Sequence, residues 1–172
     1  MIPLSSAISS GFTWSKLPRN RGYELRRNGE VVGSLRRPSL WSSSSLAETQ
    51  DGHWTFRRGG LLGAGARILD SAQQQIASFK AAWGCRGTLT FGDGQTFHLE
   101  CKGWWHPVWS VLGEDGQPVL HLHTREKTVD LPTGVPVPDN RLSLLIMFTW
   151  YRVLQAEEDA ASAAMIAVIA AS

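Results

Sequence analysis

Residues 142–151 read LSLLIMFTWY, which is apolar on every side of a helix rather than along one stripe. Asp139 or Asn140 can cap the N-terminus of this helix. Its apolar part is about 20 Å long, shorter than the roughly 30 Å hydrocarbon core of a bilayer. A short helix without a polar face has to be surrounded by the rest of the chain. We therefore predict a helix over about 141–155 that is buried on nearly all sides.

Upstream of this helix, residues 22–123 repeat one local pattern: a short alternating apolar and polar segment, a polar turn and a second alternating segment. Four β-hairpins are predicted, over 23–35, 67–79, 88–99 and 109–123. They imply at least eight strands, which is typical of a closed antiparallel barrel or a sandwich. The serine run 42–45 and the glycine cluster 59–65 are expected to be loops or bulges.

The first hairpin contains Asn28-Gly29, which can supply the two positive-φ residues of a type I′ turn. A two-residue loop sets the register, so Leu25 is expected opposite Val32. The same register places Arg21 opposite Arg36. Like charges that face each other across a ribbon lower stability unless an anion relieves them. The predicted pair is therefore a physical reason to look for a phosphate ligand.

A run of hairpins that ends in one fully apolar helix is accommodated if the strands close into a barrel and the helix fills its axis. In this combination the chain resembles the tubby C-terminal-like superfamily, which includes LURP-one-related proteins and phospholipid scramblases, and most of all its small bacterial members. The resemblance lies in Glu24-Leu25 with Gly29 and Val32-Gly33, Ile68-Leu69-Asp70 with Ile76-Ala77, Trp109-Ser110-Val111-Leu112 with Asp115-Gly116, and the helix from Leu142. It implies a mainly β fold, a closed antiparallel barrel of about twelve strands around a central apolar C-terminal helix.

The domain organisation expected for the 172 residues is a lead-in over 1–19, the barrel with its helix over 20–156, and an Ala-rich C-terminal helix or tail over 157–172. Glu157-Glu158-Asp159 separate the two apolar segments as a charged break. One membrane-spanning helix through both would place three carboxylates in the bilayer, at roughly 2.5 kcal/mol or more apiece. A conventional transmembrane helix is therefore not expected.

Composition places the chain among folded domains, because 42% of its residues are hydrophobic and 19% are charged. Of the eight tryptophans, Trp104, Trp105 and Trp109 are expected mainly to pack in the core. Two cysteines, Cys85 and Cys101, make no disulfide framework and favour a reducing compartment. Since the N-terminus also has no secretory signal pattern, we expect a cytoplasmic protein that can lie at the membrane periphery.

Motifs for chemistry are weak in this sequence. The best metal candidate combines two thiols with two imidazoles, Cys85, Cys101, His121 and His123, but its spacing matches no zinc knuckle, and His98 does not improve it. The glycines at 63–65 do not form a phosphate loop, and a nucleophile elbow is missing. We expect no metal, no cofactor and no enzymatic activity.

Charge is distributed unevenly along the chain. Residues 1–60 hold nine Lys or Arg against four Asp or Glu, and the remainder holds eight against eleven. Such asymmetry favours an anionic partner for the first third. The candidate lipid- and anion-binding residues are Arg21, Arg26, Arg27, Arg36, Arg37, Arg57 and Arg58.

These charges favour a non-enzymatic module that engages anionic phospholipid headgroups at a membrane surface. Nucleic acid is not an expected partner. The alternative function is a structural or protein–protein interaction domain, in which the Ala-rich segment 160–169 docks on a partner chain.

Overall fold

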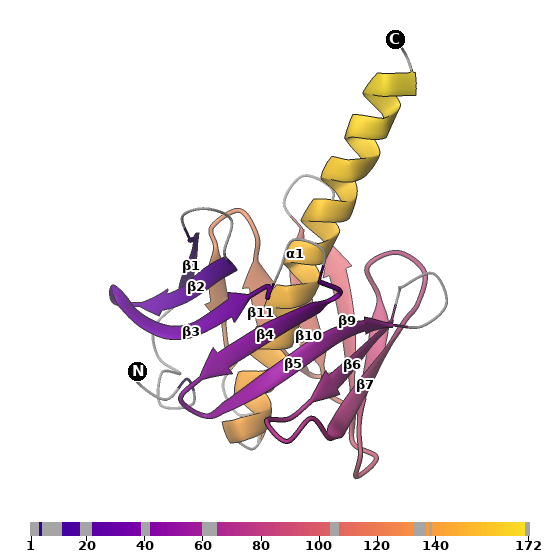
Figure 1. Ribbon diagram of the computed structural model, residues 1–172. Helices are drawn as coiled ribbons and strands as arrows, with labels where there is room; N and C mark the ends of the chain where they lie inside the picture. The colour runs from indigo at the N-terminus through magenta and orange to yellow at the C-terminus, as the bar shows by residue number, and fades with distance from the viewer. Residues whose placement is uncertain are drawn as a thin grey trace.

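The computed structural model describes residue 4 and residues 12–17, 22–38, 42–59, 65–103, 107–132, 137 and 139–170, with helical side chains described over 141–165. Over this part of the chain, twelve antiparallel strands form a nearly closed barrel with one C-terminal helix, α1 (Asp139–Ala170), through its centre (Figure 1). The predicted fold class is confirmed. The strands are β1 (Thr13–Lys16), β2 (Gly22–Arg27), β3 (Glu30–Arg36), β4 (Ser44–Thr49), β5 (Gly52–Gly59), β6 (Gly65–Leu69), β7 (Gln75–Ala81), β8 (Gly87–Phe91), β9 (Thr96–Lys102), β10 (Val108–Leu112), β11 (Pro118–His123) and β12 (Thr128–Asp130).

Each strand pairs with its neighbour in sequence, from β1 to β12. The two edge strands, β1 and β12, approach each other but form no ladder in the described residues. In such a meander, successive connections lie alternately at the two ends of the barrel. We call the end at which α1 leaves the barrel the exit end, and the end at which α1 begins the opposite end. The exit end carries the connections that follow β1, β3, β5, β7, β9 and β11.

The four predicted hairpins are confirmed as β2–β3, β6–β7, β8–β9 and β10–β11. Asn28 and Gly29 have φ angles of 48° and 84°, as the predicted turn requires. The prediction of a loop or bulge over the serine run 42–45 is wrong for its second half, because Ser44 and Ser45 begin β4. These two serines are part of the strand because they pair with Arg57 and Phe56 of β5. A run of serines gives no local sign of this pairing.

The predicted register of the first hairpin holds only next to its turn. Arg26 pairs with Val31 as expected, but a bulge shifts the ladder, so Leu25 pairs with Gly33 and not with Val32. Arg36 consequently pairs with Gly22, and the expected Arg21–Arg36 pair is wrong in register, although Arg21 itself lies outside the described residues. The bulge allows Val32 and Gly33 both to be buried. A Cβ atom at Gly33 would lie 3.1 Å from the Met147 sulfur, so this strand approaches α1 closely.

The core surrounds α1 on all sides over the predicted stretch. Phe148 packs against the rings of Phe56 and Phe79 at centroid distances of 5.4 and 5.2 Å, and Trp150 packs against Trp14 at 6.3 Å. Trp109 is buried as predicted, whereas Trp104 and Trp105 lie outside the described residues.

Two expected boundaries differ from the structure. The barrel begins before residue 20, because β1 pairs with β2 and Phe12 and Trp14 are buried. The charged residues 157–159 do not interrupt the helix, which is continuous to Ala170. Glutamate is a good helix former where it is exposed, and two of these carboxylates pair with the barrel. Of the helical residues described, no segment has the length and hydropathy needed to cross a membrane.

Cys85 and Cys101 form a disulfide, with Cα atoms 5.8 Å apart. This bond was not predicted from the sequence, where two cysteines make no disulfide framework. The β8–β9 hairpin folds the chain back on itself, pairing Gly87 with Leu99 and bringing the two thiols together. Because disulfides persist in oxidising surroundings, the two cysteines give no argument for a reducing compartment.

Replacing both cysteines by serine is expected to lower the free energy of unfolding by about 3 kcal/mol, because the bond closes a loop with a sequence separation of 16. The protein should still fold, since both cysteines are only partly buried and pack against the edge of the core. Denaturant titrations of the wild type, the reduced wild type and the double variant measure this loss. The last two should coincide, and a double variant as stable as the oxidised wild type would contradict the structural role.

Candidate anion-binding rim

Charged residues are sorted between the two ends of the barrel. Exposed basic residues lie within two positions of the strand ends at the exit end: Lys16, Arg36, Arg37, Arg57, Arg58, Arg67, Lys80, Arg86, Lys102, Arg125 and Lys127. Most acidic residues of the strands and connections lie at the corresponding positions of the opposite end: Glu30, Glu48, Asp51, Asp70, Asp93, Glu114, Asp115 and Asp130. The exceptions are three acidic residues at the exit end and two basic residues at the opposite end: Glu24, Glu100 and Glu126, and Arg26 and Arg27. The charge separation therefore runs along the barrel axis, and the exit end presents a positive surface to solvent.

The seven predicted site residues are divided by this arrangement. Arg36, Arg37, Arg57 and Arg58 lie at the exit end. Arg26 and Arg27 flank the Asn28-Gly29 turn at the opposite end, where Arg26 pairs with Glu24 at 2.6 Å. Arg21 is outside the described residues. The structure therefore brings together four members of the predicted set and places two elsewhere.

A like-charge pair does exist across the ladder, but at other residues than expected. Arg57 of β5 pairs with Arg67 of β6, and both are exposed on the outer surface. Ser44 and Ser78 flank them on β4 and β7. Two guanidinium groups held side by side between hydroxyl residues add to the positive potential of the exit end.

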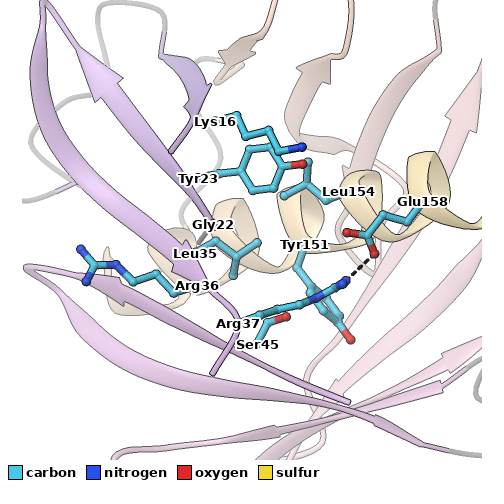
Figure 2. Close-up of a pocket in the computed structure, with 10 residues that line it drawn as sticks. All are labelled: Lys16, Gly22, Tyr23, Leu35, Arg36, Arg37, Ser45, Tyr151, Leu154 and Glu158. Carbon is cyan, nitrogen blue, oxygen red and sulfur yellow. Dashed lines mark hydrogen bonds and ion pairs between the residues drawn. The ribbon is translucent and has the colours of Figure 1, made fainter. Parts of the chain in front are cut away.

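A pocket of about 160 Å³ opens at the exit end, between the ends of β1–β4 and α1. Figure 2 shows Lys16 and Arg37 in this pocket with Tyr23 and Tyr151, and Arg36 at its edge with the guanidinium pointing away. A second pocket of about 330 Å³ adjoins it and adds Arg58, Ser42 and Ser43. The two pockets share Arg37, Ser45, Tyr151 and Glu158, so they form one continuous recess beside the emerging helix.

The charged residues of α1 bind to this recess. Glu158 accepts a hydrogen bond from Arg37, and Asp159 accepts bonds of 2.9 and 3.2 Å from Nη2 of Arg58 (Figure 2 shows the first pair). All four side chains remain more than a third exposed. Exposed ion pairs of this kind contribute about 0–1 kcal/mol each. They are weak enough for another anion to replace them.

Tyr151 and Gln155 line the recess from α1, and hydrogen bonds connect them to Arg152, which lies outside both pockets. Nη1 of Arg152 donates to Gln155 at 2.7 Å, and Nε2 of Gln155 donates to the Tyr151 hydroxyl at 2.7 Å. The Arg152 guanidinium also lies over the Phe79 ring, 4.8 Å from its centroid. Burial raises the pKa of Tyr151 and lowers the pKa of Arg152. These residues were not predicted to form a site, because isolated polar positions in an otherwise apolar helix give no recognisable pattern.

Trp83 is 96% exposed and lies in the β7–β8 connection, at the exit end and two residues from Cys85. Trp83 lies apart from the Trp104, Trp105 and Trp109 cluster and was not predicted to be exposed. A usable signal was its position in the short segment Ala82–Arg86, between two predicted hairpins. The disulfide ties this connection to β9 and so positions the indole.

The candidate metal ligands are engaged elsewhere. The two thiols form the disulfide, the His121 ring contacts the Ser110 hydroxyl at 2.8 Å, and His123 pairs with Asp130 at 2.8 Å. Over the described ranges, no group of three or more His, Cys, Asp or Glu residues could hold a metal ion.

Comparison of the chain with protein-family models, curated proteins and solved structures finds no match. The site is therefore interpreted from its own geometry: a basic, partly hydroxyl-lined recess at the same end of the barrel as an exposed indole. Such a surface can bind anions.

Proposed function

We propose that this protein is a non-enzymatic binding module of the tubby-like type, which engages anionic phospholipid headgroups through the exit end of its barrel. The observation that carries the proposal is the gathering of basic side chains from separate connections at one end, with exposed Trp83 beside them. The barrel built around an axial helix supports the family part of the proposal.

The charge distribution favours one orientation at a membrane. Each basic residue near an anionic surface contributes about 1 kcal/mol. The acidic opposite end would be repelled by the same surface. An indole favours the headgroup layer, so Trp83 can add an uncharged contribution at the end that the electrostatics select.

The test is sedimentation with vesicles of phosphatidylcholine, with and without phosphatidylserine, over a series of salt concentrations. Binding should require phosphatidylserine and weaken as salt shortens the Debye length from about 10 Å at 0.1 M to 3 Å at 1 M. A duplex DNA titration is the control for general phosphate attraction. Equal partitioning onto both kinds of vesicle, or preference for DNA, would overturn the proposal.

Replacing Trp83 by Ala is expected to weaken vesicle binding several-fold and to leave the salt dependence unchanged, because the indole contributes without charge. The comparison variant is Leu46→Ala, which removes an exposed apolar side chain from the outer wall of the barrel, where Leu46 of β4 pairs with Arg36 of β3. Sedimentation of both variants measures the effect. Equal losses in the two variants would contradict a specific place for Trp83 at the surface.

The second candidate function is a protein–protein interaction domain. It is favoured by the projection of α1 beyond the barrel (Figure 1), where residues 160–165 are exposed and Met165 is 65% exposed. Truncation after Asp159 tests the two surfaces separately. The exit-end proposal predicts that vesicle binding survives truncation, whereas the interaction-domain alternative predicts that association with a protein partner is lost with the extension.

A further inference from the structure

We infer that the recess at the exit end is a site for a phosphate monoester, and that Glu158 of α1 occupies the place of this external anion. The inference rests on the proposed function, since it specifies which anion the exit end binds. It adds that the barrel's own helix competes for the site.

The first argument is that the recess already binds an anion. Glu158 lines both pockets and pairs with Arg37, and Asp159 pairs with Arg58 at 2.9 Å. The guanidinium groups of Arg37 and Arg58 thus point toward carboxylates of α1. Because such exposed pairs contribute little stability, a more highly charged anion can displace them.

The second argument is charge balance. Three cationic head groups face the two pockets, those of Lys16, Arg37 and Arg58, whereas the Arg36 guanidinium points away (Figure 2). Asp159 offsets one of them, so two formal positive charges remain when an external anion takes the place of Glu158. A phosphate monoester carries about −1.5 to −2 at neutral pH. A phosphodiester carries about −1 and would leave the recess positively charged.

The third argument is a pair of buried hydroxyl groups that face the shared part of the recess (Figure 2). Ser45 is 4% exposed, and its hydroxyl has no hydrogen-bond partner among the residues described. Tyr151 is 3% exposed; its oxygen accepts a bond from Gln155, and its proton has no acceptor in the described part of the chain. A phosphate monoester has enough oxygens to accept from guanidinium and hydroxyl groups together.

The experiment compares vesicles containing phosphatidic acid, which has a phosphate monoester, with vesicles containing phosphatidylserine, matched by surface potential. Wild-type protein should prefer phosphatidic acid. Glu158→Gln should raise this preference at least about threefold, because it removes the internal competitor. The matched control is Glu126→Gln in the β11–β12 connection of the same end, which lies outside both pockets. It should strengthen binding to both lipids equally.

Ser45→Ala should lower the preference for phosphatidic acid several-fold while leaving phosphatidylserine binding intact, because a hydroxyl carries no net charge. A cooperative thermal transition like that of the wild type verifies its fold. The inference would be overturned if the wild type bound the two lipids equally and if Glu158→Gln left this ratio unchanged. If both lipids still bind better than phosphatidylcholine, the proposed function stands.

Calorimetry with glycerol 3-phosphate and inorganic phosphate identifies the source of the anion. A lipid ligand is supported if the protein binds these soluble compounds more weakly than phosphatidic acid vesicles and if Glu158→Gln strengthens the binding of both. Binding of the soluble compounds without any vesicle binding supports the site with a soluble phosphate and overturns the membrane proposal. Glycerol 3-phosphate that fails to compete with phosphatidic acid even in Glu158→Gln overturns the site.

Discussion

Replacing Ile146 by Asp is expected to abolish folding. Ile146 is fully buried in the part of α1 that fills the barrel, between Leu145 and Met147, which are also fully buried. An unpaired charge in such a position costs several kcal/mol, a large part of the 5–15 kcal/mol that stabilises an ordinary domain. Circular dichroism and soluble yield measure the outcome, and Leu145→Asp should behave in the same way.

The control for this variant lies on the same helix. Met165→Asp introduces the same side chain about five turns later, where Met165 is 65% exposed outside the barrel. It should leave the thermal transition nearly unchanged. A soluble Ile146→Asp protein that unfolds cooperatively near the wild-type temperature would refute the view that the barrel is built around this helix.

Reversing two charges at the exit end, by Arg36→Glu with Arg37→Glu, is expected to reduce binding to phosphatidylserine vesicles at least about tenfold. Two basic residues near the surface account for about 2 kcal/mol, and a factor of ten corresponds to about 1.4 kcal/mol. Stability should change by no more than about 1 kcal/mol per site, because both side chains are exposed and the Arg37–Glu158 ion pair that is lost contributes about 0–1 kcal/mol. Sedimentation and thermal unfolding measure the two effects.

The matched control is Arg26→Glu with Arg27→Glu, which makes the same change in net charge at the opposite end. β3 spans seven residues between the two ends, about 20 Å, which exceeds the Debye length of about 8 Å at physiological salt. Binding should therefore change little. An equal loss in both double variants would show a response to net charge alone and would contradict an oriented binding surface.

The site could be predicted only in part. The excess of arginine in the first third of the chain indicated an anionic partner, and four of the seven candidates do lie together at the exit end. Arg26 and Arg27 were grouped with them because they are close in sequence. In an antiparallel hairpin, however, residues beside the turn lie at one end and residues beyond the next strand lie at the other. Closeness in sequence is therefore a poor guide to which charges share a surface.

Local patterns were enough to predict the architecture. The features that predicted it are strand alternation, the Asn28-Gly29 turn and a helix without a polar face. All three depend on residues near one another in the chain, and each is compatible with few arrangements of strands and helix. The bulge beside Leu25, the Cys85–Cys101 bond and the pairing of Arg37 with Glu158 depend instead on how strands meet. The last pair is 121 residues apart in sequence. Only the closing of the barrel around α1 brings these two residues together, because it selects which connections surround the helix where it emerges.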